Sequence, residues 1–327
     1  LPTGQGGVEP HRAIGKVPDP RLERLTALFK PKRTVHAQVE WVDVPGFQGG
    51  AGPDGGREAT RFLEHARRVD ALAQVIRCFD GGYGPPDPSG ELATLALELT
   101  LADLQIVENR LERLAKDKQR MGKVANPLEP PLMERFRDQL ENDRPLRDLD
   151  LNPDERKLAA GYAFLTQKPL IVVLNHEEGE SAPAGVVAAA EAAGAEVVAL
   201  CARVEEELAE LDPEEAREFL AALGIAEPAL HRMIQASYHA LDLQSFFTVG
   251  PDECRAWAVR RGATAPEAAG VSHSDLQRGF IRAETTAYED LVAAGSLAAA
   301  KAAHKVRLEG KSYVVQDGDV IEIRFSV

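Results

Sequence analysis

Apolar residues are distributed along the first two thirds of the chain in short runs. Four of these runs are rich in β-branched residues and bounded by polar or turn-forming residues: 39–47, 71–79, 169–174 and 195–200. Such runs are typical of strands buried on both faces of a parallel sheet. Apolar residues at helical spacing lie between them, in 57–70 and 186–193. We therefore expect an α/β domain whose strand–helix–strand connections are right-handed.

A longer helical pattern interrupts this alternation between residues 91 and 165. Apolar residues recur there mostly at three- and four-residue steps: Leu97, Leu101, Leu104, Val107, Leu111, Leu114 and Met121. Asn126-Pro127 breaks the run, and the cap signal Asn152-Pro153-Asp154-Glu155 starts a further helix. We interpret 91–165 as an inserted, partly coiled-coil arm. The alternative is a set of ordinary helices packed on the sheet.

The pattern changes again near residue 243, where short strands alternate with short helices and turns. The strands are expected at 245–249, 255–261, 280–284, 305–308, 312–315 and 320–325. Asp317-Gly318-Asp319 is expected to form a tight turn before the last strand. Residues 243–327 therefore form a predicted α+β domain with a mixed sheet.

Composition narrows the classes of partner and compartment. The net charge of −14 argues against extended, nonspecific binding of DNA or of anionic membrane, although a local basic patch stays possible. The three cysteines are widely spaced and odd in number, which favours free thiols over disulfides. No apolar run approaches the length of a membrane span, and no signal peptide opens the chain. We expect a cytoplasmic monomer.

The run at 39–47 carries the first candidate for nucleotide chemistry. Asp43 is followed three residues later by Gly46, where the strand breaks into a loop. Ligands of doubly wound folds bind outside the carboxyl ends of the strands. In phosphate-loop nucleotidases an aspartate at that edge holds Mg²⁺ through water, and the glycine lets a backbone N–H approach the terminal phosphate. The alternative is an ordinary strand-to-turn junction, because Asp-x-x-Gly is a common pattern.

Several longer motifs occur in a fixed order along nearly the whole chain. In the first two thirds they are Val-Pro-Asp-Pro-Arg-Leu (17–22), Asp-Val-Pro-Gly-Phe (43–47), Val-Ile-Arg-Cys-Phe (75–79), Leu-Thr-Leu-Ala-Asp-Leu (99–104), Asn-His-Glu-Glu (175–178) and Cys-Ala-Arg-Val-Glu (201–205). The strongest block follows: Arg-Ala-Trp-Ala-Val (255–259), Ala-Pro-Glu-Ala-Ala-Gly (265–270), His-Ser-Asp-Leu-Gln-Arg-Gly-Phe-Ile-Arg-Ala-Glu (273–284) and Tyr-Val-Val-Gln-Asp-Gly-Asp-Val (313–320). Together they resemble the YchF family, also called the Obg-like ATPases, within the Obg branch of translation-factor P-loop proteins.

The resemblance implies a protein of three parts. A P-loop NTPase-like, Ras-like domain of the Obg type would comprise residues 1–90 and 166–242, the coiled-coil arm 91–165, and a ubiquitin-like β-grasp (TGS) domain 243–327. It also implies that the protein binds and slowly hydrolyses ATP, possibly GTP, with Mg²⁺, and that it associates with ribosomal RNA or protein. The arm carries basic residues towards its tip, among them Arg113, Lys116 and Arg120, although such a run is usually only a solvated face.

The resemblance assigns base recognition to the end of the strand 169–174 and the turn at 201–203. Asn175 would orient the base, with the His176 backbone at its edge and the backbone of Cys201 and Ala202 beside it. Glu178 stands where GTPases carry the aspartate that accepts two hydrogen bonds from guanine, so a longer carboxylate favours adenine. The alternative for Asn175 is a simple strand-end cap.

The chain departs from the family pattern at the phosphate site. It contains no Gly-x-x-x-x-Gly-Lys-Ser/Thr, the switch threonine has no clear counterpart before Val17, and the loop after Phe79 lacks the histidine that the family uses in hydrolysis. Phe47 replaces the water-positioning glutamine of Ras-like enzymes, so the catalytic residue is unknown. Because Leu1-Pro2 and Thr3-Gly4-Gln5 match the two sides of the family's phosphate loop, we expect that Pro2 and Thr3 are not neighbours in the natural protein.

Two functional classes remain open from the sequence. The first is an ATP-dependent switch that acts on ribosomes. The second is a nucleotide-dead module that binds ribosomes or RNA through the arm and the TGS domain. A third class, TGS-bearing synthetases or alarmone enzymes, lacks support because the chain has neither a metal-binding His-Asp pair nor a synthetase signature.

Overall fold

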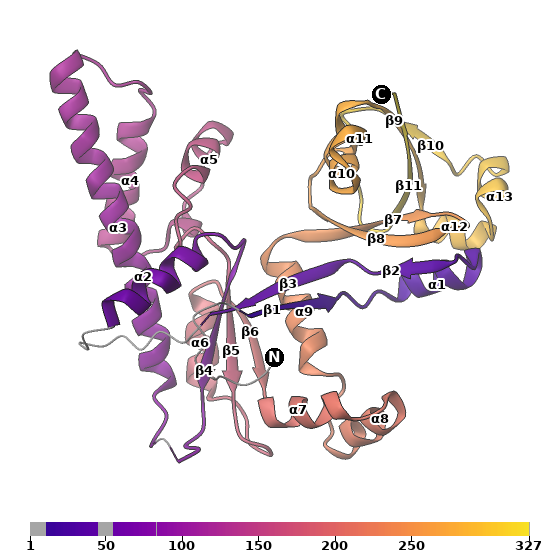
Figure 1. Ribbon diagram of the computed structural model, residues 1–327, viewed down its shortest axis with the longest axis horizontal. Helices are drawn as coiled ribbons and strands as arrows, with labels where there is room; N and C mark the ends of the chain where they lie inside the picture. Colours follow the sequence, from indigo (N-terminus) through magenta and orange to yellow (C-terminus); the bar gives the residue numbers. More distant parts are fainter. Residues whose placement is uncertain (1–10, 45–54, 83, 327) are drawn as a thin grey trace. The chain divides into compact units, whose positions relative to one another are not determined.

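The computed structural model describes residues 11–44, 55–82 and 84–326 (Figure 1). The described chain divides into two compact units. One contains the chain from Asp43 to Ala229, and the other joins Arg12–Val42 to the chain that starts at Leu230.

The first unit is built on a parallel sheet of three strands, in the order β4 (Leu72–Arg77), β5 (Leu170–Asn175) and β6 (Glu196–Leu200). β5 lies in the middle and is buried over five of its six residues, as its unbroken apolar sequence predicts. Arg77, Asn175 and Leu200 are in register, so the carboxyl ends of the strands share one edge. The predicted α/β class with a parallel sheet is confirmed.

The helices of this unit follow the predicted alternation. They are α2 (Gly55–Ala66), α3 (Pro88–Met121), α4 (Glu129–Glu141), η1 (Leu146–Asp148), α5 (Pro153–Ala160), α6 (Ala184–Ala192), α7 (Ala202–Glu210) and α8 (Pro213–Ala222). One core joins the sheet to its helices through residues such as Ile76, Leu174 and Ala190. The predicted buried strand at 39–47 is wrong in its place: its described residues belong to β3 (Gln38–Asp43), which is half-buried and pairs outside this parallel sheet because its hydrogen-bond partner is another segment.

The far part of α3 and α4 pack as a long helical hairpin with its own core (Figure 1). Val107, Leu114 and Phe136 are buried in it, and Asn152 and Glu155 form the predicted capping box at the start of α5. The prediction that the apolar seam of α3 is buried along its whole length is wrong at both of its ends. Leu97, Leu101 and Met121 are about half exposed.

The lower end of α3 turns Leu99 and Asp103 inward instead. The Asp103 carboxylate is fully buried and accepts hydrogen bonds from the N–H groups of Leu165 (3.0 Å) and Thr166 (2.7 Å) and from the Thr166 hydroxyl (2.9 Å). Arg67, which follows α2, lies 3.2 Å from the same carboxylate. A buried charge needs such partners, so the acid of the Leu-Thr-Leu-Ala-Asp-Leu motif joins three segments of the fold.

The second unit contains a mixed sheet of six strands in the order β10-β9-β11-β7-β8-β2. The strands are β2 (Arg33–Val35), β7 (Leu243–Val249), β8 (Glu253–Arg260), β9 (Phe280–Ala287), β10 (Arg307–Glu309) and β11 (Asp319–Phe325). The helices are α9 (Ala229–Ala240), α10 (Ala265–Ser272), α11 (Ser274–Arg278), α12 (Tyr288–Ala294) and α13 (Leu297–Ala302). The mixed α+β character of this region is confirmed.

The predicted strand at 312–315 is wrong. The Tyr313 N–H closes a turn onto the Gly310 carbonyl at 3.2 Å, and the Val315 N–H bonds to the Ala263 carbonyl at 3.0 Å. Only an isolated bridge joins Val314 to Thr264. The backbone groups of this stretch are therefore used by a turn and a loop rather than by a strand ladder.

The N-terminal part of the second unit consists of β1 (His11–Lys16), α1 (Pro20–Phe29), β2 and β3. Asp19 caps α1 and Pro20 occupies its first turn. β1 pairs with β3 as a separate ribbon, whereas β2 joins the large sheet in parallel with β8. Leu22 and Leu25 of α1 are fully buried in the same core as Phe247 and Val320. The three-part division of the chain stays a prediction. Residues 12–42, which that division assigns to the nucleotide-binding domain, pack here with the C-terminal segment.

Candidate functional site

Asn175 lies at the shared carboxyl edge of the parallel sheet, where it ties β5 to the start of α7. Its Oδ1 accepts a hydrogen bond from the Ala202 N–H at 3.0 Å. Its backbone oxygen accepts from the Cys78 N–H at 2.8 Å, and the next N–H, that of His176, donates to the Leu200 oxygen at 2.9 Å. Cys201 is the N-cap position of α7. The structure therefore brings four predicted base-site residues together: Asn175, His176, Cys201 and Ala202.

The Asn175 contact also orients its amide group. The oxygen, assigned from this hydrogen bond, is committed to Ala202, so the NH₂ group is the end available to a ligand. N7 of both purines is an acceptor. Asn175 can therefore orient a purine base without choosing between adenine and guanine, and it caps α7 at the same time.

Glu178 follows in a tight turn and is exposed. The turn closes through the Glu180 N–H and the Glu177 oxygen at 3.1 Å, and Gly179 has a φ of +77°, which favours glycine. The His176 ring lies inside this segment, with Nδ1 2.9 Å from the Glu177 oxygen. The Glu178 carboxylate therefore lies on the solvent side of the turn, three residues after Asn175, and its role in base selection stays a prediction.

Asp43 is the last residue of β3 and its side chain is exposed. Gly46 and Phe47 lie outside the described residues, as do Pro2 and Thr3, so their roles stay predictions. Among the residues that the structure describes, no group of three His, Cys, Asp or Glu side chains could hold a metal by itself. A single exposed carboxylate suits Mg²⁺, which keeps several waters and takes its other ligands from substrate phosphates.

Arg77 organises the neighbouring loop, a role that the sequence of its motif, Val-Ile-Arg-Cys-Phe (75–79), does not reveal. Its guanidinium donates to the carbonyl oxygens of Phe79, Asp80 (2.9 Å) and Gly84 (3.0 Å). The Asp80 carboxylate in turn accepts from the Gly82 N–H at 3.0 Å. Because Arg77 is in register with Asn175, this loop leaves the sheet at the candidate nucleotide edge.

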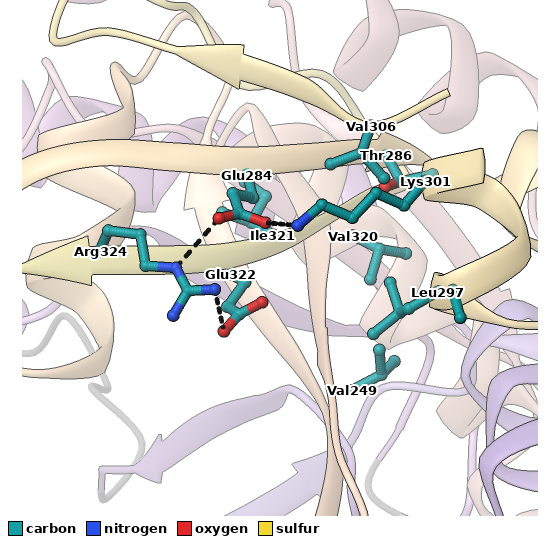
Figure 2. A pocket seen from close by; sticks show the side chains of 11 residues that line it. Val249, Glu284, Thr286, Leu297, Lys301, Val306, Val320, Ile321, Glu322 and Arg324 are labelled. Atoms are coloured by element: carbon teal, nitrogen blue, oxygen red, sulfur yellow. Dashed lines mark hydrogen bonds and ion pairs between the residues drawn. The ribbon is translucent and has the colours of Figure 1, made fainter. Parts of the chain in front are cut away.

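A cavity of about 160 Å³ lies in the second unit, between β9, β11 and α13 (Figure 2). Its apolar floor includes Val249, Leu297 and Val320. Its charged groups satisfy one another, since Glu284 lies 3.4 Å from Lys301 and 3.1 Å from Arg324. Ligand sites for drug-sized molecules have roughly 300–1,000 Å³. This cavity is therefore too small to be the nucleotide site, and its charged side chains are already paired with one another.

Comparison with known proteins identifies the family. A family model named YchF-GTPase_C, described as a protein of unknown function (DUF933), matches residues 243–326. The chain is 44% identical over 332 residues to the ribosome-binding ATPase YchF of Bacillus subtilis, and this match covers 98% of the chain and 90% of the relative. It is 35% identical over 332 residues to Obg-like ATPase 1 of Oryza sativa subsp. japonica, covering 98% of the chain and 84% of the relative.

A solved structure is also similar. The YchF GTPase of Schizosaccharomyces pombe superposes with a TM-score of 0.84 at 32% identity, and the match covers 97% of this chain and 88% of that one. The fold and the strand-end site define a protein of the P-loop NTPase class with an added C-terminal domain. The chain belongs to the YchF family.

Proposed function

We propose that this protein is a ribosome-associated ATPase that binds ATP with Mg²⁺, hydrolyses it slowly and acts as a nucleotide-dependent switch in the cytoplasm. The observation that carries the proposal is the Asn175 side chain, held between β5 and α7 at the carboxyl edge of a parallel sheet. The names of its relatives, ribosome-binding ATPase and Obg-like ATPase, support the same activity. Within the described residues no helix is long and apolar enough to cross a membrane.

The preference for ATP rests on Glu178. Guanine presents N1–H and a 2-amino group, which a correctly placed aspartate accepts together. The side chain of Glu178 is one methylene longer, and adenine offers an acceptor at N1 instead of a donor. Guanine therefore loses the paired contact at this position, whereas adenine loses nothing.

The Glu178→Asp variant tests this proposal. We expect the parent to prefer ATP and the variant to gain GTP affinity, with a change of roughly 1–3 kcal/mol for one or two hydrogen bonds. Competition binding of the two nucleotides measures it, and Glu180→Asp, an exposed neighbour in the same turn, is the matched control. Equal affinities in the parent that the substitution leaves unchanged would contradict the assignment.

We assign the phosphates and Mg²⁺ to the loop after β3. Asp43 would hold the ion through water, and the Gly46 N–H would approach the terminal phosphate. The backbone at Cys201 and Ala202 would lie beside the base. Phe47 follows Gly46, and because an apolar side chain cannot orient water, slow hydrolysis is the expected result.

The phosphate loop itself is proposed to stand between Pro2 and Thr3. The three-stranded sheet supports this, because the side chain of Val75 in β4 is 66% exposed although parallel sheets are normally covered on both faces. An additional strand and helix beside β4 would cover it. Mass spectrometry of the natural protein tests this, since a peptide in which Pro2 is bonded directly to Thr3 would refute the proposal.

The second candidate is a nucleotide-dead module that binds ribosomes or RNA through the arm and the C-terminal domain. Its support is the set of exposed basic residues near the end of α3, including Arg113, Lys116 and Arg120. ATP binding by the natural full-length protein separates the two candidates. Ribosome binding without any ATP binding would favour the module.

A further inference from the structure

A cluster of charges joins α1 to the C-terminal segment within the second unit. The Arg21 guanidinium donates to both carboxylate oxygens of Asp19, at 3.0 and 2.8 Å, and to both of Asp317, at 2.9 and 3.3 Å. Asp317 also accepts from the Ser245 N–H at 3.0 Å. The guanidinium lies 5.2 Å from the centre of the Phe247 ring. The Arg21 side chain thereby reaches a residue 296 positions away in sequence, Asp317.

The turn at Gly318 packs closely against the Arg21 side chain. Gly318 has a φ of +88°, and a Cβ added there would lie 3.1 Å from Arg21. Its N–H donates to the Ser245 carbonyl at 2.8 Å, so the turn before β11 is fixed to β7. Arg21 is only partly exposed and Asp19 is buried. Partly buried, bidentate arginine–carboxylate contacts are stronger and more specific in geometry than surface ion pairs.

Arg21 lies in α1, the helix that follows β1 in the chain. The β1–β3 ribbon enters α1 through Val17, whose N–H bonds to the Ala37 oxygen at 2.8 Å. β3 leaves the same ribbon and ends at Asp43, the candidate Mg²⁺ residue. The ribbon that ends at Asp43 therefore continues, through β1, into the helix that is bound to the C-terminal sheet (Figure 1).

We propose that Arg21 is a positioning residue that couples nucleotide binding at Asp43 to the C-terminal β-sheet through the contacts with Asp19 and Asp317. This inference rests on the proposed nucleotide-binding function and names the route of its switch. A change at Asp43 moves β3 and its partner β1. The contacts of Arg21 with Asp19 and Asp317, called the clamp below, transmit that displacement to the turn before β11. Coupling of this kind rests on an element with two arrangements whose equilibrium both sites bias, and the β1–β3 ribbon with α1 is the element proposed here.

Hydrogen exchange of the natural full-length protein, with and without ATP·Mg²⁺, tests the coupling. ATP binding is measured separately by calorimetry. In the parent we expect ATP to change exchange both in peptides from 12–42 and in peptides from 243–326. In Arg21→Gln the change in 12–42 persists, while the change in 243–326 falls by about fivefold or more, the lower end of the usual range of allosteric coupling factors.

Three further variants make the result specific. Arg12→Gln removes an exposed ion pair with Glu40 in the same ribbon (2.7 Å) and should behave as the parent. Asp317→Asn weakens the clamp at its other end, so its exchange response in 243–326 should match that of Arg21→Gln. The double variant should lower this response little further than either single variant. Thermal melting of each variant identifies any that fails to fold, and Arg21→Lys, which keeps the charge, should then restore part of the response.

Two outcomes would overturn the inference while leaving the proposed function standing. One is ATP binding without any response in 243–326 of the parent, and the other is a full response in Arg21→Gln. Absence of ATP binding by the parent would instead overturn the proposed function, and the inference with it.

Discussion

Asp103 illustrates how much of the fold depends on single buried groups. Its carboxylate is completely removed from solvent and accepts from two backbone N–H groups and one hydroxyl, with Arg67 beside it. An amide at this position offers one acceptor oxygen and places an NH₂ group against donors. The loss is therefore larger than that of one hydrogen bond.

We expect Asp103→Asn to lower the free energy of unfolding by about 3–5 kcal/mol, the range for breaking a buried charge pair. Urea denaturation measures it. Asp117→Asn, which removes an exposed pair with Arg120, should change stability by less than about 1 kcal/mol. Similar values for the two variants would show that the Asp103 network is not a structural anchor.

Glu129 provides a pH-dependent contribution at the start of α4 in the helical hairpin. Arg110 donates to it twice, at 2.8 and 2.7 Å, and the Tyr162 hydroxyl donates as well. The Arg110 hydrogen bonds lower the pKa of Glu129 despite burial, and the Tyr162 bond adds to this. Burial, followed by the bond to Glu129, raises the pKa of Tyr162 to about 12.

A lowered folded pKa means that ionised Glu129 stabilises the fold fully above its unfolded pKa of about 4.3. This contribution is lost as the pH falls through the lower folded value. We therefore expect the difference in unfolding free energy between the parent and Glu129→Gln to be constant near neutral pH and to shrink below about pH 4. Denaturation at several pH values checks it, and a difference that grows in acid would refute the assignment.

At the scale of elements, the helical arm separates structural charges from solvated ones. Arg110 is tied to Glu129 inside the hairpin, so it does not belong to the basic surface near the tip. Arg113, Lys116 and Arg120 are exposed. Lys116 and Arg120 also form weak pairs along α3, with Glu112 at 3.5 Å and Asp117 at 3.2 Å. These three cations belong to the exposed basic surface of the arm, which could meet a polyanion.

We expect reversal of Arg113, Lys116 and Arg120 to glutamate to weaken ribosome co-sedimentation. Each lost phosphate contact should reduce the slope of log K against log salt by roughly 0.7–0.9. Reversal of the exposed residues Arg24, Arg68 and Arg217 gives a control with the same change in net charge. Undiminished binding by the arm variant would show that its tip charges are only solvated.

At the scale of the whole molecule, the chain builds its second unit from two distant segments. Residues 12–42 supply a helix and a strand to a core that otherwise comes from residues after Leu230. Leu22 and Leu25 are fully buried there, and Arg33–Val35 extend the large sheet alongside β8. The C-terminal segment alone would expose the apolar surface that α1 covers.

We expect a fragment of residues 243–327 to be much less stable than the same fragment joined by a flexible linker to residues 12–42. Burial of Leu22 and Leu25 accounts for about 1.5–3 kcal/mol each. Thermal melting and binding of a hydrophobic dye compare the two fragments. A linked fragment with Leu22 and Leu25 changed to alanine is the control, and equal melting of all three would refute a shared core.

The sequence by itself determined those features that depend on neighbours along the chain. The unbroken apolar run of β5 specifies a central parallel strand, and Asn152 and Glu155 specify a helix start through contacts within one turn. Asn175 was placed at the strand end because the apolar run stops there. The ordered motifs identified the family, which the similarity to YchF relatives confirms.

Tertiary structure alone decided which faces are buried and which segments meet. Helical spacing would allow either Leu97 and Leu101 or Leu99 and Asp103 to be buried. Packing against residues 163–166 buries Leu99 and Asp103. The partners of Arg21, Arg77 and Arg110 are carboxylates and carbonyls brought near by the fold. Local periodicity fixes the faces of an element, but its partner follows from the packing of residues that are distant in sequence, so residues 12–42 could join the C-terminal sheet.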